Sequence, residues 1–233
     1  MAKHGKKYLK AAEMAPASNV LLPVMGALEK IKALAYAKFD ESIDVNVNLG
    51  IDASKGDQVV RSSVLLPHGR GRQVKVLVFA KGDYAEQAEK AGADYVGAED
   101  LVAKIESGWM DFTYAIATPD LMVMVGRLAK LLGPRGLLPN KKVGTVTFDV
   151  KSAVEDLKRG RMFFKNDKSG IVHFSIGKVS FSAEWLYDNL VAFAKSLAAA
   201  RPAAMKGKYL KKMVLSSTMG VGLSVNPDDL LRS

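Results

Sequence analysis

Two kinds of strand pattern alternate along this chain, and their order constrains the fold more than any other feature. Residues 43–51, IDVNVNLGI, alternate apolar and polar side chains, which is typical of a strand with one buried and one solvated face. Residues 74–80, VKVLVFA, are almost entirely apolar, as expected for a strand covered on both faces. The alternating pattern returns at 170–181, GIVHFSIGKVSF. Because the chain leaves one pattern and later returns to it, we predict an inserted domain.

The middle of the chain alternates strands and helices, which predicts a small parallel sheet with helices on both faces. We therefore predict a protein of mixed α/β and α+β class with two domains. A split α+β domain, 1–69 and 160–233, is formed by both termini, and a Rossmann-like α/β domain, 70–159, is inserted into it. The alternative is a single domain with ordinary surface loops. The expected helices cover 23–39, 83–91, 99–107, 120–132 and 182–200, and the expected strands cover 43–51, 59–66 (beside 43–51), 74–80, 94–97, 114–117, 170–181 and 212–225.

Glycines lie where the chain passes between the predicted domains. Gly69, Gly71 and Gly160 each stand beside an arginine at these two crossings. Since two crossings restrict motion to an opening and closing of the domains, these glycines predict a double hinge.

The chain is basic, with 34 Lys and Arg against 24 Asp and Glu and a formal charge of +10, which favours a polyanionic partner. The predicted split domain holds 20 basic and 12 acidic residues, and the inserted domain holds 14 and 12. The split domain therefore carries most of the excess. Within the inserted domain, residues 127–151 hold six basic residues and one acid. The basic run at 1–10 is interpreted as a flexible arm, with phosphate contact as the more specific alternative.

Several classes of function lack their signatures. The absence of cysteine excludes disulfides, thiolate metal sites and cysteine nucleophiles, and it fits a reducing cytoplasm. The three histidines have no metal-ligand spacing, no Gly-x-Ser-x-Gly elbow occurs, and no G-x-G-x-x-G follows residues 74–80. No stretch resembles a signal peptide or a membrane span. We expect no enzyme, cofactor, metal or membrane partner; the rival hypothesis is an enzyme that uses a nucleotide in the Rossmann-like domain.

The basic loop GPRGLLPNKKVGT, residues 133–145, resembles a phosphate-binding loop only in composition. A P-loop needs Lys and a hydroxyl residue directly after its last glycine, whereas Gly136 is followed by two leucines. We interpret the loop as a rigid connection with a secondary electrostatic role.

The segment KMVLSSTMGVGLSV, residues 212–225, is the clearest candidate for a binding surface. Its odd positions, including Met213, Leu215 and Met219, are apolar and predict a core face. Its even positions carry Ser216, Thr218 and Gly220. Small hydroxyls bind phosphate and ribose oxygens, and glycine lets another backbone approach closely. The alternative is a loosely packed edge strand with a glycine bulge.

Two further polar and basic clusters belong to the predicted split domain. YAKFDES, residues 36–42, places Lys38 and Phe39 at a helix end, where Phe39 either joins the core or packs on a base or ribose. FKNDKSG, residues 164–170, has the composition of a hairpin turn. Their presence in the positive domain favours RNA as the partner.

Seven segments occur in an order that resembles one known family. They are AKFDES, LPHGRGRQVKVLVFAKG, AGADYVG, GWMDFTYAIATPDLM, LGPRGLLPNKKVGT, FKNDKSG and STMGVG, and together they cover nearly the whole chain. The chain resembles the bacterial large-subunit ribosomal protein of the lateral stalk beside the exit site, the ribosomal protein L1 family. The resemblance implies the split domain, the inserted Rossmann-like domain and the hinge.

The resemblance also implies function and site residues. It implies a structural constituent of the large subunit in the cytoplasm, a monomer within the ribosome, that binds the stalk of large-subunit ribosomal RNA. It further implies assistance in releasing spent transfer RNA from the exit site and repression of the protein's own messenger RNA; a dedicated repressor acting off the ribosome is the second rival. The RNA-binding residues that the resemblance implies are Lys38, Phe39, Ser42, Asp167, Lys168, Thr218, Met219 and Gly220. We add Ser216, which lies at an even position of the segment 212–225 described above.

Overall fold

The structure is a computed structural model that describes residues 5–17, 20–205 and 207–231. The chain divides into two compact units, one formed by the residues up to Gly71 and from Met162 onward, the other by Arg72–Arg161. The first unit contains α1 (Lys6–Met14), α2 (Val24–Leu34), β1 (Ser42–Leu49), the short helix η1 (Gly56–Gln58), β2 (Arg61–Leu65), β6 (Arg161–Lys165), β7 (Ile171–Lys178), α8 (Ala183–Ala199), β8 (Leu210–Ser217), β9 (Leu223–Val225) and α9 (Asp228–Leu231). The second contains β3 (Val76–Phe79), α3 (Asp83–Lys90), β4 (Tyr95–Gly97), α4 (Glu99–Glu106), β5 (Tyr114–Ala117), η2 (Pro119–Leu121), α5 (Met122–Arg127), α6 (Ala129–Arg135), η3 (Lys141–Val143) and α7 (Val150–Arg159).

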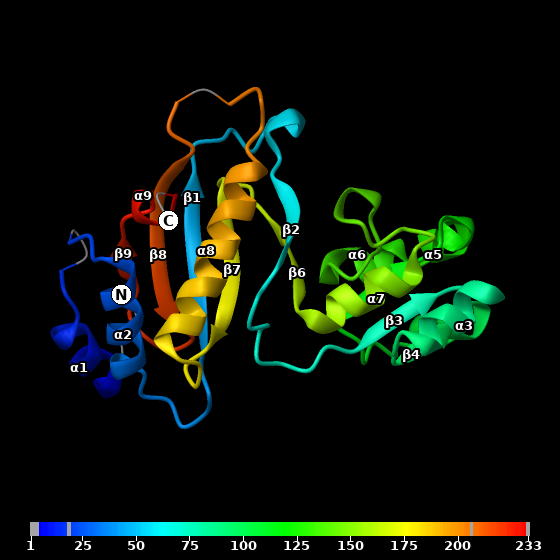
Figure 1. Ribbon diagram of the computed structural model, residues 1–233, viewed down its shortest axis with the longest axis horizontal. Helices are drawn as coiled ribbons and strands as arrows, with labels where there is room; N and C mark the ends of the chain where they lie inside the picture. Colours follow the sequence, from blue (N-terminus) through cyan, green and yellow to red (C-terminus); the bar gives the residue numbers. More distant parts are fainter. Residues whose placement is uncertain (1–4, 18–19, 206, 232–233) are drawn as a thin grey trace. The chain divides into compact units, whose positions relative to one another are not determined.

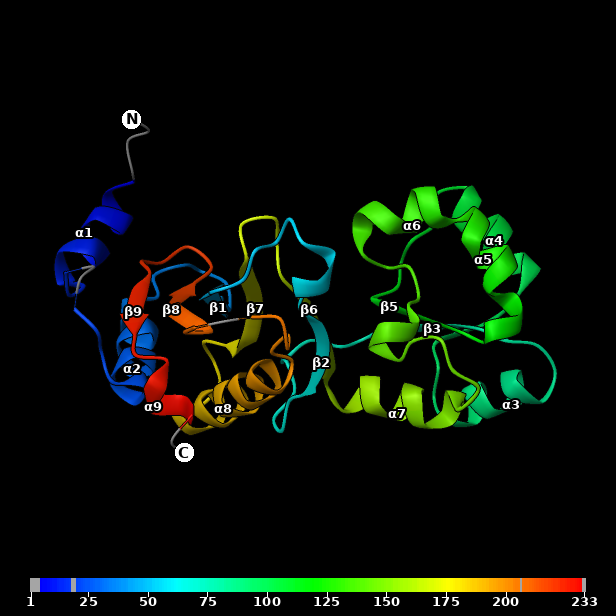
Figure 2. The same ribbon diagram turned by 90° about the horizontal axis from the view of Figure 1, so that it is seen from above.

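An antiparallel sheet in the order β7-β1-β8-β9 organises the first unit (Figure 1). Helices α2 and α8 lie on the same face of this sheet (Figure 2). The alternation predicted for β1 is confirmed, because Ile43, Val45, Val47 and Leu49 are buried against these helices while the residues between them are not. Ser182 caps α8 as expected, with its hydroxyl accepting a hydrogen bond from the Trp185 N–H. The other face of the sheet is left polar.

The second unit is built on the parallel sheet β4-β3-β5, so the predicted strand-helix alternation is confirmed. Helices α3 and α7 lie on one side of this sheet, and α4, α5 and α6 lie on the other (Figure 2). Every residue of β3 is fully buried, as the continuous apolar run predicts. Beyond β5, Val146 forms one parallel bridge to Ala117, which ties the segment after η3 to the sheet edge.

Several predictions about the elements are wrong. The helix expected over 23–39 ends at Leu34, because the Ala37 N–H binds the Glu41 carboxylate instead of a helical carbonyl. The strand expected over 59–66 does not join β1; β2 pairs with β6 in a separate two-stranded sheet, where Asn166 bonds both the N–H and the C=O of Val60. The helix expected over 120–132 is divided into η2, α5 and α6 and extends to Arg135.

The expected strand 212–225 is a hairpin. β8 ends at Ser217, the chain turns, and β9 pairs back onto β8 with Leu215 opposite Leu223 and Met213 opposite Val225. Because apolar residues recur at odd positions of the sequence through the turn as well, the pattern of one long strand and that of a hairpin look the same in the sequence. The basic run at 1–10, expected as a flexible arm, is helical from Lys6 onward, and residues 1–4 lie outside the described residues.

Candidate nucleic-acid interface

Two loops of the first unit meet at the end of β1 that begins with Ser42. One is the segment after α2, residues 35–41, and the other is the turn between β8 and β9, residues 218–222. The Thr218 N–H donates to the Ser42 C=O (3.0 Å), and the Ser42 N–H donates to the Thr218 Oγ1 (3.0 Å). The Tyr36 hydroxyl donates to the Met219 C=O (2.6 Å). These contacts bring Ser42, Thr218 and Met219 together, as the sequence-based site requires.

A buried carboxylate holds the two loops. Glu41 is 1% exposed, and its two oxygens accept hydrogen bonds from the Ala37 N–H (3.0 Å) and the Met219 N–H (2.9 Å). Burial raises the pKa of Glu41, but the hydrogen bonds from Met219, the Ser217 hydroxyl and Ala37 outweigh it, so that its pKa lies below the ordinary value. The ionised carboxylate is therefore part of the folded structure of this surface.

We call Glu41 and its hydrogen bonds to Ala37 and Met219 the Glu41 clamp. The side chains around this clamp are exposed. Phe39 is 56% exposed and Met219 is 52% exposed, so neither lies in the core. This corrects the alternation argument for Met219: β8 ends at Ser217, and residues beyond the strand end do not keep its two-residue period. Lys38 and Thr218 are also exposed. An exposed Phe beside an exposed Lys supplies a stacking surface and a cation for phosphate.

Gly220 fits closely against this clamp. A Cβ at Gly220 would lie 2.4 Å from the Ser217 Oγ, which binds Glu41. The backbone of Gly220 does not have a positive φ, so the requirement for glycine is one of space rather than of backbone conformation. Any larger residue would displace the Ser217 hydroxyl from the carboxylate.

The polar face of the sheet leads from this clamp to the second cluster. Across strands, Asp44 pairs with Ser216 on one side and Ser175 on the other, and Asn46 pairs with His173. The His173 Nδ1 lies 2.6 Å from the Asn46 Oδ1. This face, which includes Ser216 as predicted, offers hydroxyl, amide and imidazole groups to a polar ligand.

Asp167 and Lys168 lie at the opposite end of β1, where Asn48 pairs with Ile171. That end is about 20 Å from Ser42 at roughly 3.3 Å per residue. Asp167 Oδ1 accepts from the Ser169 N–H and the Ile171 N–H (2.8 Å each), and the Ile171 bond holds the pKa of Asp167 below its ordinary value. Asp167 thus shapes the turn, and Lys168 beside it is exposed. The predicted residues therefore form two clusters joined by a polar sheet face.

Sequence reasoning missed several residues of this surface. Glu41 was not singled out, although it lies inside the AKFDES segment; its signal is an acid directly before an alternating strand. Lys178 donates to the Ser42 Oγ (2.9 Å) and orients it. Asn46 and Asn48 were visible as the polar half of the β1 alternation. Lys38, Lys168 and Lys212 form no ion pair within the described part of the chain, so their charges are available to a ligand.

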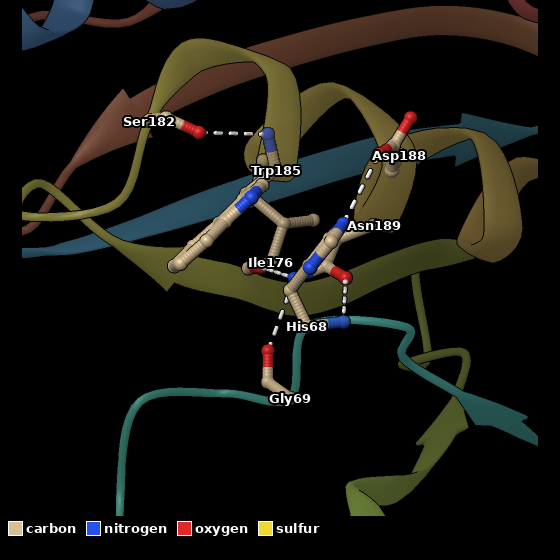
Figure 3. Close-up of polar contacts among 7 residues, drawn as sticks. All are labelled: His68, Gly69, Ile176, Ser182, Trp185, Asp188 and Asn189. Carbon is tan, nitrogen blue, oxygen red and sulfur yellow. Dashed lines mark hydrogen bonds and ion pairs between the residues drawn. The ribbon is translucent and has the colours of Figure 1, made fainter.

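The predicted hinge glycines lie at the two crossings, and all three have positive φ. Helix α8 anchors the first crossing (Figure 3): buried Asn189 accepts from the His68 N–H (3.1 Å) and donates to the Gly69 C=O (3.0 Å) and the Ile176 C=O (2.8 Å). The His68 ring stacks on Trp185, with centroids 5.1 Å apart. A Cβ on Gly71 would lie 2.9 Å from the Phe181 ring. Gly69 is therefore held by its hydrogen bond to Asn189, Gly71 packs against Phe181, and Gly160 ends α7.

The carboxyl end of the parallel sheet is poorly suited to a nucleotide. Helices α3 and α4, which follow β3 and β4, carry two acids each in their first turns, among them Asp83 and Glu99. Lys81 after β3 is paired with Glu99 (2.8 Å). These carboxylates repel a phosphate where a helix N-terminus would otherwise attract it. The geometry argues against the nucleotide-using enzyme.

Comparison with known families decides the wider assignment. The ribosomal protein L1p/L10e family matches residues 31–221, which is most of the chain. The chain belongs to this family. Family members are structural RNA-binding proteins rather than enzymes, and the protein is accordingly a structural ribosomal protein that binds RNA of the large subunit. In the described ranges, no helix is long and apolar enough to cross a membrane, and no group of three metal-ligating side chains occurs.

Proposed function

We propose that this L1-family protein is a bacterial component of the lateral stalk and binds the stalk region of large-subunit ribosomal RNA through its first unit. The observation that carries the proposal is the Glu41 clamp. A buried carboxylate fixes two loops so that Lys38, Phe39, Thr218 and Met219 project from one ordered surface. Preorganised contacts bind more tightly because less freedom is lost on binding. The polar face of the sheet extends this surface to Lys168.

The contacts suit structured RNA. Hydroxyls on Ser42, Ser216 and Thr218 match ribose and phosphate oxygens, while Phe39 offers a face for stacking. Lys38 and Lys168 lie at opposite ends of a strand and would engage phosphates about 20 Å apart. The split domain 1–69 with 160–233 is thus proposed as the RNA-binding domain, and the Rossmann-like domain 70–159 as its mobile partner, with the hinge at Gly69, Gly71 and Gly160.

Two finer roles follow from the family resemblance. The protein would assist release of spent transfer RNA from the exit site as the stalk moves. It would also bind a similar structure in its own messenger RNA and repress its translation. Both roles use the same RNA-binding surface, and the hinge would serve the first.

Co-sedimentation with large subunits tests the central claim. Subunits depleted of the protein should recover it when they carry the stalk RNA and fail to do so when that RNA is deleted. Lys38→Gln combined with Lys168→Gln should weaken recovery, whereas Lys81→Gln, which removes a cation already paired with Glu99, should not. Equal recovery with and without the stalk RNA would refute the assignment. Competition by the leader of the protein's own messenger tests the repressor role.

A further inference from the structure

A second positive surface lies in the other unit, on α5, α6 and the loop that follows. Residues 121–148 contain five Lys or Arg and no Asp or Glu. Such a long stretch without a carboxylate is notable because the rest of this unit is rich in acids.

The cations of α5 and α6 are exposed to solvent, whereas several apolar residues of these helices are buried. Val125, Leu128 and Leu132 are fully buried and face the parallel sheet. Arg127, Lys130 and Arg135 are exposed. Arg127 ends α5, whereas Lys130 and Arg135 lie on α6, so the three exposed cations come from two successive helices. Figure 2 shows both helices on the side of the sheet away from α3 and α7.

These cations differ from the cations of the same unit that pair with acids. Six Lys or Arg of the unit form ion pairs, for example Lys158 with Asp94 (2.6 Å) and Arg161 with Asp156 (2.8 Å). The side chains of Arg127, Lys130, Arg135 and Lys141 form neither a hydrogen bond nor an ion pair with any described residue. Their full charge is therefore open to a ligand.

The loop after α6 is ordered by its own bonds and presents Lys141 in a defined position. Gly136 ends α6 in the left-handed conformation, and Pro139 is buried. The Asn140 N–H donates to the Thr145 Oγ1 (2.8 Å), and the Thr145 N–H donates back to the Asn140 C=O (3.2 Å). The loop 133–145, which resembles a phosphate-binding loop only in composition, is thus an ordered turn that carries the exposed cation Lys141.

We propose that Arg127, Lys130, Arg135 and Lys141 form a second RNA surface that holds the phosphate backbone of a double-helical RNA segment. Residues 122–136, MVMVGRLAKLLGPRG, contain no amide, hydroxyl or aromatic side chain, so this part of the surface has no group that reads base edges or stacks on bases. The contact is electrostatic and independent of sequence. RNA is the chosen polyanion because the chain belongs to a ribosomal family.

The test uses the full-length protein, a 24-base-pair RNA duplex of arbitrary sequence and a series of salt concentrations. The triple variant Arg127→Gln, Lys130→Gln, Arg135→Gln is compared with Lys75→Gln, Lys81→Gln, Lys90→Gln, which removes the same charge from ion pairs of the same unit. Each lost phosphate contact lowers the salt slope by about 0.7–0.9. We expect the first triple to lower the slope by about two and the second to leave it unchanged. The proposal would be overturned if both triple variants lowered the salt slope equally, or if neither lowered it.

A second measurement locates the contact directly. Acetylation of Lys130 should slow when the duplex is bound, whereas Lys104, exposed and unpaired on α4, should react at the same rate. Repeating this with Lys38→Gln and Lys168→Gln separates the two surfaces, because loss of the first unit's site would leave Lys130 protected. If vesicles of phosphatidylserine protect Lys130 and the duplex does not, the surface binds lipid and the RNA assignment is wrong.

Discussion

The two units hold their charges differently. In the second unit, six Lys or Arg are paired with nearby acids, whereas the exposed cations Arg127, Lys130, Arg135 and Lys141 on α5, α6 and the loop after them are not. In the first unit, Lys38 and Lys168 are exposed without acidic partners, while the buried acid Glu41 binds backbone N–H groups instead of a cation. The comparison teaches that net charge alone does not locate a binding surface. A cation neutralised by its neighbour attracts a phosphate weakly, so pairing must be considered together with charge.

The sheets of the two units also differ in how far helices cover their faces. The second unit's sheet is covered on both sides, and its central strand β3 is fully buried. The first unit's sheet has one face without a helix, where Asn46 and His173 meet. Only the first unit can therefore offer strand side chains to a ligand, whereas the second can offer helix faces and loops.

The largest expected effect is on RNA binding, and it comes from comparing substitutions of unpaired cations in the first unit with substitutions of paired cations in the second. Lys38→Glu with Lys168→Glu should weaken binding of stalk RNA on the order of 100-fold, because two attractive contacts become repulsive. Lys75→Glu with Lys81→Glu changes the net charge equally and should have little effect. RNA titration at one fixed salt concentration compares the two. If both double variants bind equally weakly, total charge and not its location governs binding.

The next effect concerns the Glu41 clamp. Glu41→Gln should lower the free energy of unfolding by about 2 kcal/mol at pH 7, because an ionised acceptor of buried hydrogen bonds is replaced by a neutral amide. The pKa of Glu41 is lowered on folding, so its stabilisation is present above the unfolded pKa and is lost as pH falls through the folded pKa. Urea unfolding of both proteins between pH 7 and pH 3 measures this. The two curves should converge at the acid end; parallel curves would assign the effect to packing.

How much of this site was predictable depends on the distance between the interacting residues. The β1 alternation, the buried β3 run and the Ser182 cap are local patterns, and each is confirmed. The clamp is different: Glu41 and Met219 are 178 residues apart, so no local pattern links them. The end of α2, by contrast, involves the contact between Ala37 and Glu41, which are only four residues apart.

The sequence likewise did not show which strands pair with each other. The segment 59–66 has a strand pattern, but its partner β6 is chosen by Asn166, which lies 106 residues from Val60. The hairpin of β8 and β9 keeps the alternation of a single strand. The positions of Lys38 and Lys168 at opposite ends of β1 also required the strand register, because sequence alone does not say which ends of strands meet.

A smaller effect is expected at Thr218. Its hydroxyl accepts from the Ser42 N–H, so Thr218→Val should cost about 1 kcal/mol of folding stability, more than its exposure alone suggests. If the hydroxyl also contacts RNA, binding should weaken by a further 1–3 kcal/mol. Thr218→Ser keeps the hydroxyl and serves as the control. Thermal unfolding without RNA and titration with RNA separate the two effects; normal binding by the valine variant would remove Thr218 from the interface.

The smallest effect is expected at Lys81, and it sharpens the comparison of the two units. Lys81 and Glu99 form an exposed ion pair at 2.8 Å, and such pairs add little to stability because water and salt screen them. Lys81→Gln should therefore leave both the urea midpoint and the salt slope of RNA binding unchanged. Lys38→Gln removes the same charge from an unpaired position and should lower that slope by about one. Measuring both variants in the same salt series tests the principle directly, since a lowered slope for Lys81→Gln would show that pairing with an acid does not withdraw a cation from RNA.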